Sequence, residues 1–136
     1  MPVNGRSHLR IARPSRDLAA AERFWVEGLG LGVVWRTEGG GEPGEHDLLM
    51  VGWPDAGWHL ELVHEAGAPV EPRPTEEDLL VVSVDGPVPQ ELGARLEEHG
   101  GKRVSSPNPY WNRWGVTIED PDGYRFVLCE RGWSNQ

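Results

Sequence analysis

The chain has 136 residues, and its 22 acidic side chains outnumber 13 basic ones to give a formal net charge of −9 at pH 7. This length suits one compact domain with its own hydrophobic core. The negative charge disfavours binding to the phosphate backbones of nucleic acids and favours cationic ligands. No apolar run approaches the length of a membrane span, and residues 1–10 lack the apolar core of a signal peptide. Composition therefore predicts a cytoplasmic protein with no membrane segment, and Cys129, the sole cysteine, excludes an internal disulfide.

The first half of the chain predicts a strand, one helix and three further strands. Apolar residues recur at spacings of three and four from Leu18 to Leu29, which predicts an amphipathic helix with Ser15 or Asp17 as its N-cap. Alternating apolar residues and turn signals predict the strands, which span residues 9–12, 31–36, 47–51 and 58–63.

The second half repeats this order after a connection. Residues 66–78 contain three prolines and no periodicity, which is typical of a segment without regular structure. Residues 89–99 then predict a helix, and residues 105–112 predict a loop. The predicted strands of this half are residues 79–84, 102–104, 116–119 and 125–129.

A short repeat connects the two halves. Residues 54–62 and 121–128 each contain a Pro-Asp turn closed by glycine, then an aromatic residue, then an alternating strand. The repeat indicates two similar modules, which can be compared position by position. Four residues after the turn glycine, the first module has Glu61 and the second has Val127.

The order of these features resembles the glyoxalase/bleomycin-resistance/extradiol-dioxygenase superfamily, also called the vicinal oxygen chelate proteins. The similarity extends over nearly the whole chain, and the residues that carry it are Asp17-Leu18, Phe24-Trp25, Leu29-Gly30, Ser83-Val84-Asp85, Gly100-Gly101 and residues 119–124. The resemblance implies an α+β fold with two βαβββ modules whose mixed sheets curl around a shared cavity. We therefore expect a single glyoxalase-like domain, residues 1–136, made of module one (7–65), a linker (66–78) and module two (79–131).

The resemblance also implies where a metal ion would bind. Metal-using members place ligands on the first and last strand of each module, and these positions fall here on Arg10, Glu61, Leu79 and Val127. Only Glu61 can coordinate a metal, because aliphatic side chains have no lone pair and arginine stays protonated. His8 lies two residues before Arg10, so it shares that face of the strand. We predict no cofactor and no catalytic metal, with His8 and Glu61 as the only candidate ligands if one is found.

The same comparison predicts that Arg10 and Glu61 lie near each other inside the cavity. The family brings these positions together around one ion, so the guanidinium would pair with the carboxylate in the ion's place. The alternative is that Arg10 points to solvent and Glu61 is an ordinary surface residue of its strand. His59 should share the face of Glu61, and the two are candidate catalytic residues, with His59 as a general base. The alternative for His59 is a hydrogen-bonded histidine without a chemical role.

The densest aromatic segment lies just before the strand at 116–119. Stacking faces beside hydrogen-bond donors are typical of small-molecule sites. The candidate ligand-binding residues, besides Arg10, are Trp58, Tyr110, Trp111, Asn112, Arg113 and Trp114. The alternative is that these aromatics close one end of the fold or cover a dimer seam.

Three functions remain open at this point. The first is a small-molecule binding protein with an incomplete metal site, which sequesters a cationic aromatic compound as the drug-resistance members of the superfamily do. The second is an enzyme, a lyase or isomerase of the vicinal oxygen chelate type that uses Glu61 with His8. A third is a former metalloenzyme fold retained for a protein partner. The resemblance also implies a homodimer.

Overall fold

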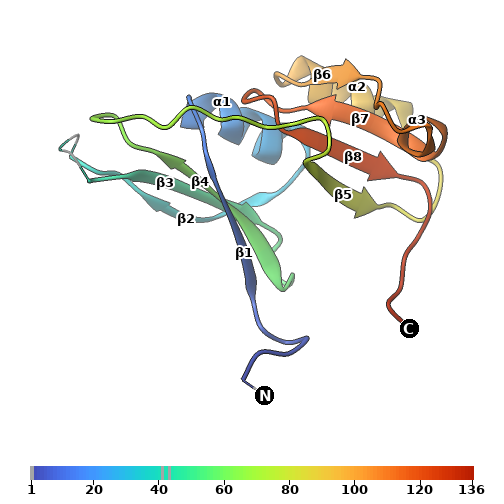
Figure 1. Ribbon diagram of the computed structural model, residues 1–136, viewed down its shortest axis with the longest axis horizontal. Coiled ribbons are helices and arrows are strands. Elements are labelled where there is room, and N and C mark those ends of the chain that lie inside the picture. Colours follow the sequence, from blue (N-terminus) through green and yellow to red (C-terminus); the bar gives the residue numbers. More distant parts are fainter. Residues whose placement is uncertain (1, 41, 43) are drawn as a thin grey trace. The chain divides into compact units, whose positions relative to one another are not determined.

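The computed structural model describes residues 2–40, 42 and 44–136. The chain divides into two compact units, residues 1–72 and 73–136, which we call unit 1 and unit 2. Each unit contains one four-stranded mixed sheet with helices of its own (Figure 1). No helix of the described residues is long and apolar enough to cross a membrane.

Unit 1 is built from one sheet and one helical segment. Its elements are β1 (Leu9–Pro14), α1 (Leu18–Glu22), η1 (Arg23–Gly28), β2 (Gly32–Thr37), β3 (Asp47–Gly52) and β4 (Trp58–His64). The strand order is β1-β4-β3-β2, with β1 parallel to β4 and the other pairs antiparallel. A parallel pair needs a crossover, and the helical segment is part of it.

The helix predicted from Leu18 to Leu29 forms, but it changes type along its length. Asp17 caps its start, where its Oδ1 accepts a hydrogen bond from the Ala20 backbone N–H at 3.1 Å. The segment then widens into the π-helix η1, and the Leu29 N–H reaches back five residues to the carbonyl of Phe24 at 3.0 Å. The wide turn allows Phe24 and its neighbour Trp25 to be buried together.

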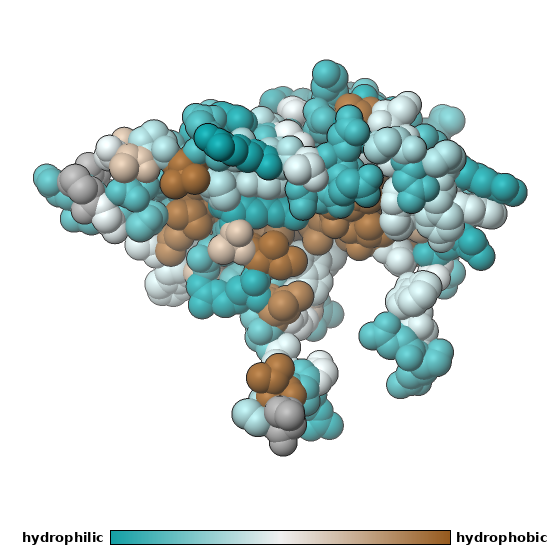
Figure 2. All heavy atoms as spheres, viewed as in Figure 1, coloured by the Kyte–Doolittle hydropathy of each residue, from teal (hydrophilic) through white to brown (hydrophobic). Residues whose placement is uncertain are grey.

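The two faces of the unit 1 sheet differ in chemistry. Leu60 and Leu62 of β4 are buried and, with Leu49 of β3, form the core against the helical segment. Because successive residues of a strand point to opposite faces, His59 and Glu61 lie on the other face, which we call the polar face. Figure 2 shows apolar side chains among polar ones at the surface along β1 and β4.

Strand β2 forms one edge of this sheet. Its Val33, Val34 and Trp35 are exposed, and the pairing with β3 is interrupted by a bulge between Val33 and Trp35. Bulges are one of the means by which proteins discourage the pairing of exposed edges with other chains.

Unit 2 has the same topology. Its elements are β5 (Leu79–Ser83), α2 (Gln90–Glu98), β6 (Lys102–Val104), α3 (Pro109–Trp114), β7 (Gly115–Glu119) and β8 (Arg125–Cys129). The strand order is β5-β8-β7-β6, with β5 parallel to β8 and the other pairs antiparallel. Phe126 and Leu128 of β8 are buried on the core side with Leu96 of α2, and Cys129 is a buried free thiol.

One prediction about unit 2 was wrong. The segment predicted as a loop, residues 105–112, contains most of the short helix α3. Asn108 caps this helix by accepting a hydrogen bond from the Tyr110 backbone N–H at 3.0 Å, and Pro109 occupies its first turn. Proline suits that position because its missing N–H would have no partner within the helix.

The α+β fold of two βαβββ modules is confirmed, and so is the equivalence of positions between them. Arg10 lies opposite His59 in unit 1, and Leu79 lies opposite Arg125 in unit 2. Residues 66–78 contain no helix or strand, as expected.

Candidate functional site

The ion pair expected on the first and last strands of unit 1 is present. The Arg10 guanidinium donates from Nη2 to Oε1 of Glu61. The Arg10 side chain is 57% exposed and that of Glu61 is only 15% exposed, so the pair connects an open cation to a largely buried carboxylate. The predicted proximity of Arg10 and Glu61 is therefore confirmed, although neither residue is among those that line the cavities described below.

A second pair lies beside it on the polar face. Nε2 of His8 and Nδ1 of His59 are 2.7 Å apart, so one imidazole donates a hydrogen bond to the other. His59 is only 7% exposed, and its Nε2 is buried without a hydrogen-bond partner among the described residues. Burial lowers the pKa of His59, with smaller contributions from His8 and Arg10, while Glu61 opposes them. These effects favour the neutral form of His59 more than in a free histidine.

These contacts bear on whether unit 1 could hold a divalent metal ion. The donors at hand are His8, His59 and Glu61, but the carboxylate is paired with Arg10 and the two imidazoles with each other. Within the described parts of the chain, no group of three or more His, Cys, Asp or Glu side chains is arranged to hold a metal. A fixed guanidinium next to Glu61 would also repel a cation. The residues of unit 1 thus do not fit the ion that the superfamily implies.

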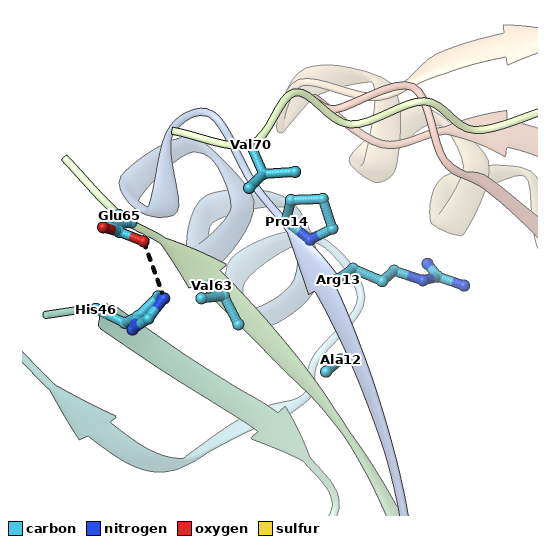
Figure 3. A pocket seen from close by; sticks show the side chains of 7 residues that line it. All are labelled: Ala12, Arg13, Pro14, His46, Val63, Glu65 and Val70. Carbon is cyan, nitrogen blue, oxygen red and sulfur yellow. Dashed lines mark ion pairs between the residues drawn. The ribbon is translucent and has the colours of Figure 1, made fainter. Parts of the chain in front are cut away.

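A cavity of about 250 Å³ lies further along β1 and β4 (Figure 3). Ala12 and Val63 line it. Ala12 lies two residues after Arg10 on β1, and Val63 lies two residues after Glu61 on β4, so both are on the polar face. Figure 3 shows His46 and Glu65 directed toward each other at one side of it, with a separation of 3.2 Å. The lining residues are Ala12, Arg13, Pro14, His46, Val63, Glu65 and Val70, and Arg13 points away from the others.

Sequence reasoning missed the His46–Glu65 pair, although a signal for it exists. The two residues flank the β3–β4 hairpin symmetrically, since Asp47 lies opposite His64 in the register. Residues just beyond the ends of two paired strands remain close enough for their side chains to interact.

Unit 2 has its own cavity, of about 460 Å³, between β5, the end of β8 and α3. Its size lies in the range of ligand pockets, about 300–1,000 Å³. The residues that line it are Val81, Ser83, Tyr110, Trp111, Cys129, Arg131, Gly132 and Trp133. The structure thus brings Tyr110 and Trp111 to a cavity, with their rings edge to face at a centroid distance of 4.9 Å.

The other predicted ligand-binding residues of this segment do not line that cavity, although Asn112 lines a separate cavity of about 300 Å³ in unit 2. The Asn112 amide accepts a hydrogen bond from the Ser106 N–H and donates one to its carbonyl, both at 2.8 Å, so it fixes the loop before α3. The Trp114 ring lies beside two guanidinium groups, with the Cζ atoms of Arg113 and Arg131 at 5.0 and 4.8 Å from its centroid. Arg131 and Trp133 were not predicted, because they follow the last strand in a segment without periodicity.

Trp58 does not lie with the predicted catalytic residues. It alternates with His59 along β4 and so belongs to the opposite face of the sheet, where its ring packs edge to face with Trp53 at 6.1 Å. This side of unit 1 is separated from the polar face by the sheet itself.

Two matched sheets with this strand order define a glyoxalase/bleomycin-resistance fold. The chain matches the models of the YycE-like N-terminal domain over residues 9–63 and the YycE-like C-terminal domain over residues 77–130. It is 42% identical over 128 residues to the protein YycE of Bacillus subtilis, covering 90% of this chain and 86% of that one. The chain therefore belongs to the YycE-like family of the glyoxalase superfamily.

Solved structures agree with this assignment. The crystal structure of Bacillus subtilis YycE, described as a candidate glyoxalase/fosfomycin resistance protein, aligns with a TM-score of 0.81 and 35% identity, covering 96% of this chain and 94% of that one. Glyoxalase I of Leishmania major aligns with a TM-score of 0.68 and 20% identity, covering 90% of this chain and 85% of that one. TnmS3, an antibiotic binding protein of Streptomyces, aligns with a TM-score of 0.62 and 23% identity, covering 97% of this chain and 99% of that one. The last two show a shared fold.

Proposed function

We propose that this protein binds a small organic molecule and does so without a divalent metal ion. The observation that carries the proposal is the Arg10–Glu61 pair, which puts a permanent cation where the superfamily has an ion. The cavities of units 1 and 2 offer apolar walls with a few polar groups, which is the usual composition of a ligand site. The fold shared with TnmS3, which is described as antibiotic binding, agrees with such a role.

The proposal is tested by metal analysis together with ligand binding. Protein dialysed against EDTA should contain far less than one equivalent of nickel, zinc or manganese by plasma mass spectrometry. Aromatic compounds that quench its tryptophan fluorescence should quench equally with EDTA and with added metal. A stoichiometric ion that is retained by the wild type and lost in Glu61→Gln would overturn the proposal.

The charge of the ligand is a separate matter. The net charge of −9 favours a cationic aromatic compound, and that expectation rests on the surface as a whole. The lining of the unit 2 cavity instead favours a negatively charged ligand, because among the described residues it includes Arg131 and no acidic side chain. Close charges outweigh distant ones, since the screening length is about 8 Å at physiological ionic strength.

A second function, acid–base catalysis, is favoured by the state of His59. A neutral imidazole whose Nε2 has no hydrogen-bond partner among the described residues is suited to remove a proton. Because this nitrogen is shielded from solvent, a substrate would have to displace the groups that cover it on the polar face. His8 would hold the ring through the 2.7 Å hydrogen bond. In that case the protein would be a lyase or isomerase. Turnover of the hemithioacetal of methylglyoxal and a thiol should then survive EDTA and be abolished in both His59→Gln and Glu61→Gln.

The expected assembly and location are also proposals. We propose a homodimer by resemblance to the superfamily, in which two-fold dimers are common. Size-exclusion chromatography with light scattering measures this directly, and a monomer across the working concentration range would contradict it. A cytoplasmic location follows from the composition and remains a prediction.

A further inference from the structure

The unit 2 cavity differs from the unit 1 cavity in its aromatic walls. Trp111 from α3 and Trp133 from the segment after β8 line it together with Tyr110. Trp133 is 83% exposed, which is unusual for the largest apolar side chain and leaves one of its faces open for contact. Aromatic walls of this kind bind planar rings by stacking and edge-to-face contacts.

The only charged side chain that lines this cavity in the described part of unit 2 is Arg131. Its guanidinium lies over the Trp114 ring, with Cζ 4.8 Å from the centroid. A stacked guanidinium keeps its in-plane N–H groups available, and these match the geometry of a carboxylate, sulfonate or phosphate. No carboxylate among the described residues lies within ion-pair distance of Arg131, so those donors are not already used by an acidic side chain.

The backbone immediately before this arginine is held by two hydrogen bonds of Glu130. The Glu130 N–H donates to the Trp114 carbonyl at 2.7 Å, and the Gly86 N–H donates to the Glu130 carbonyl at 2.8 Å. These bonds attach the segment after β8 to the end of α3 and to the turn after β5. Arg131 is therefore presented by an anchored stretch of chain, which lowers the entropy cost of binding.

One acidic residue lies next to the backbone that follows this arginine. Asp85 lies next to Gly132, because a Cβ placed on that glycine would come within 2.9 Å of the Asp85 carboxylate. Asp85 has a positive φ of 59°, a conformation that asparagine also tolerates. Asp85→Asn can therefore remove this negative charge while keeping the turn.

We propose that the unit 2 cavity binds a planar aromatic compound that carries an anionic group, with the ring against Trp111 and Trp133 and the anion on Arg131. The proposal rests on the small-molecule binding proposed above and names the class of ligand. Aromatic carboxylates, sulfonates and phosphates share the required chemistry.

Three probes with one ring system and three charges test this: naphthalene-2-carboxylate, naphthalene-2-carboxamide and 2-naphthylmethylammonium. Affinities are measured by isothermal titration calorimetry and tryptophan quenching on the full chain. A charged hydrogen bond to Arg131 should make the carboxylate bind about ten- to one-hundredfold more tightly than the amide. Arg131→Gln should remove this preference and leave amide binding unchanged. Lys102→Gln, which changes the net charge equally on β6, should keep it.

Two further variants separate the ring contact from the charge contact. Trp111→Leu should weaken all three probes by a similar factor, roughly two- to tenfold. Asp85→Asn should strengthen only the carboxylate. Equal binding of carboxylate and amide, tighter binding of the ammonium compound, or a preference that survives Arg131→Gln would overturn the anionic class while small-molecule binding stands. Absence of binding by all three probes would overturn the aromatic class, and the metal analysis would still judge the proposed function independently.

Discussion

A double-mutant cycle on Arg10 and Glu61 measures how strongly the guanidinium is coupled to the carboxylate. Arg10→Met keeps much of the apolar stem and removes the charge, and Glu61→Gln keeps the shape of the side chain. Fully exposed pairs contribute about 0.2–1 kcal/mol, whereas breaking a buried pair costs about 3–5 kcal/mol. The exposures of 57% and 15% place this pair between these limits, and nearer the lower one because Arg10 is open to solvent. We expect Arg10→Met to lower the free energy of unfolding by about 1–2 kcal/mol, with a coupling of about 1 kcal/mol.

Urea unfolding of the wild type, both single variants and the double variant gives the coupling, provided that the dependence on denaturant is the same for all four. The Arg16–Glu71 pair is the matched control within unit 1. Its charged atoms are 2.9 Å apart, but its side chains are 48% and 63% exposed, so we expect a coupling below about 0.5 kcal/mol. The reasoning fails if Arg10 and Glu61 are coupled no more strongly than this exposed pair.

Three other outcomes follow from the structure. The pKa of His59 is lowered from its ordinary value of 6.5, so just below that pH the unfolded chain binds more protons than the folded one. The free energy of unfolding should therefore fall as the pH drops below 6.5. In denaturant titrations across pH, His59→Gln should make this dependence weaker. Gly115→Ala should lower the free energy of unfolding by about 1–3 kcal/mol, because the added Cβ would lie 3.2 Å from the Leu128 carbonyl carbon and closer still to its oxygen. Thermal unfolding measures this, and an unchanged midpoint temperature would contradict the close contact. Asn112→Asp should cost about 1–3 kcal/mol by losing the donor to the Ser106 carbonyl, and increased amide exchange of α3 would accompany it.

The topology was predictable because the two halves of the chain repeat the same order of turns and strands. The Pro-Asp turns at residues 54–57 and 121–123 fix where the last hairpin of each half begins, and the alternation after each turn fixes which face each residue takes. The resemblance implied that positions on the first and last strands of each module lie close together. Together these were sufficient to bring Arg10 beside Glu61 and to set His59 on the same face.

Local chemistry explains what the sequence did not reveal. Helix α3 has one turn and a half, which is too short for periodicity to indicate it, and only the Asn108 cap and Pro109 point to it. The widening of the helix at η1 depends on burying Phe24 and Trp25 at once, which is a property of the packed unit rather than of the segment.

The candidate site was harder to predict than the fold. Asn112 was predicted to contact a ligand, and that stays a prediction; the structure adds that its amide is hydrogen-bonded to the Ser106 backbone, which the sequence did not indicate. Arg131 and Trp133 lie in irregular chain after the last strand, where neither alternation nor helical spacing indicates which way a side chain points. The positions of such loop residues depend on the tertiary contacts that their segment makes, which the local sequence does not indicate.

The exposed valines and tryptophan of β2 affect how the protein must be handled at the bench. At neutral pH the charge of −9 keeps molecules apart in solution, but near the isoelectric point of about 4.9 this repulsion vanishes. The edge of β2 would then favour association between molecules, although the bulge and the charged Arg36 on that strand oppose it. Purification and storage well above pH 5 should prevent precipitation, and light scattering across a pH series would show turbidity rising first near that value.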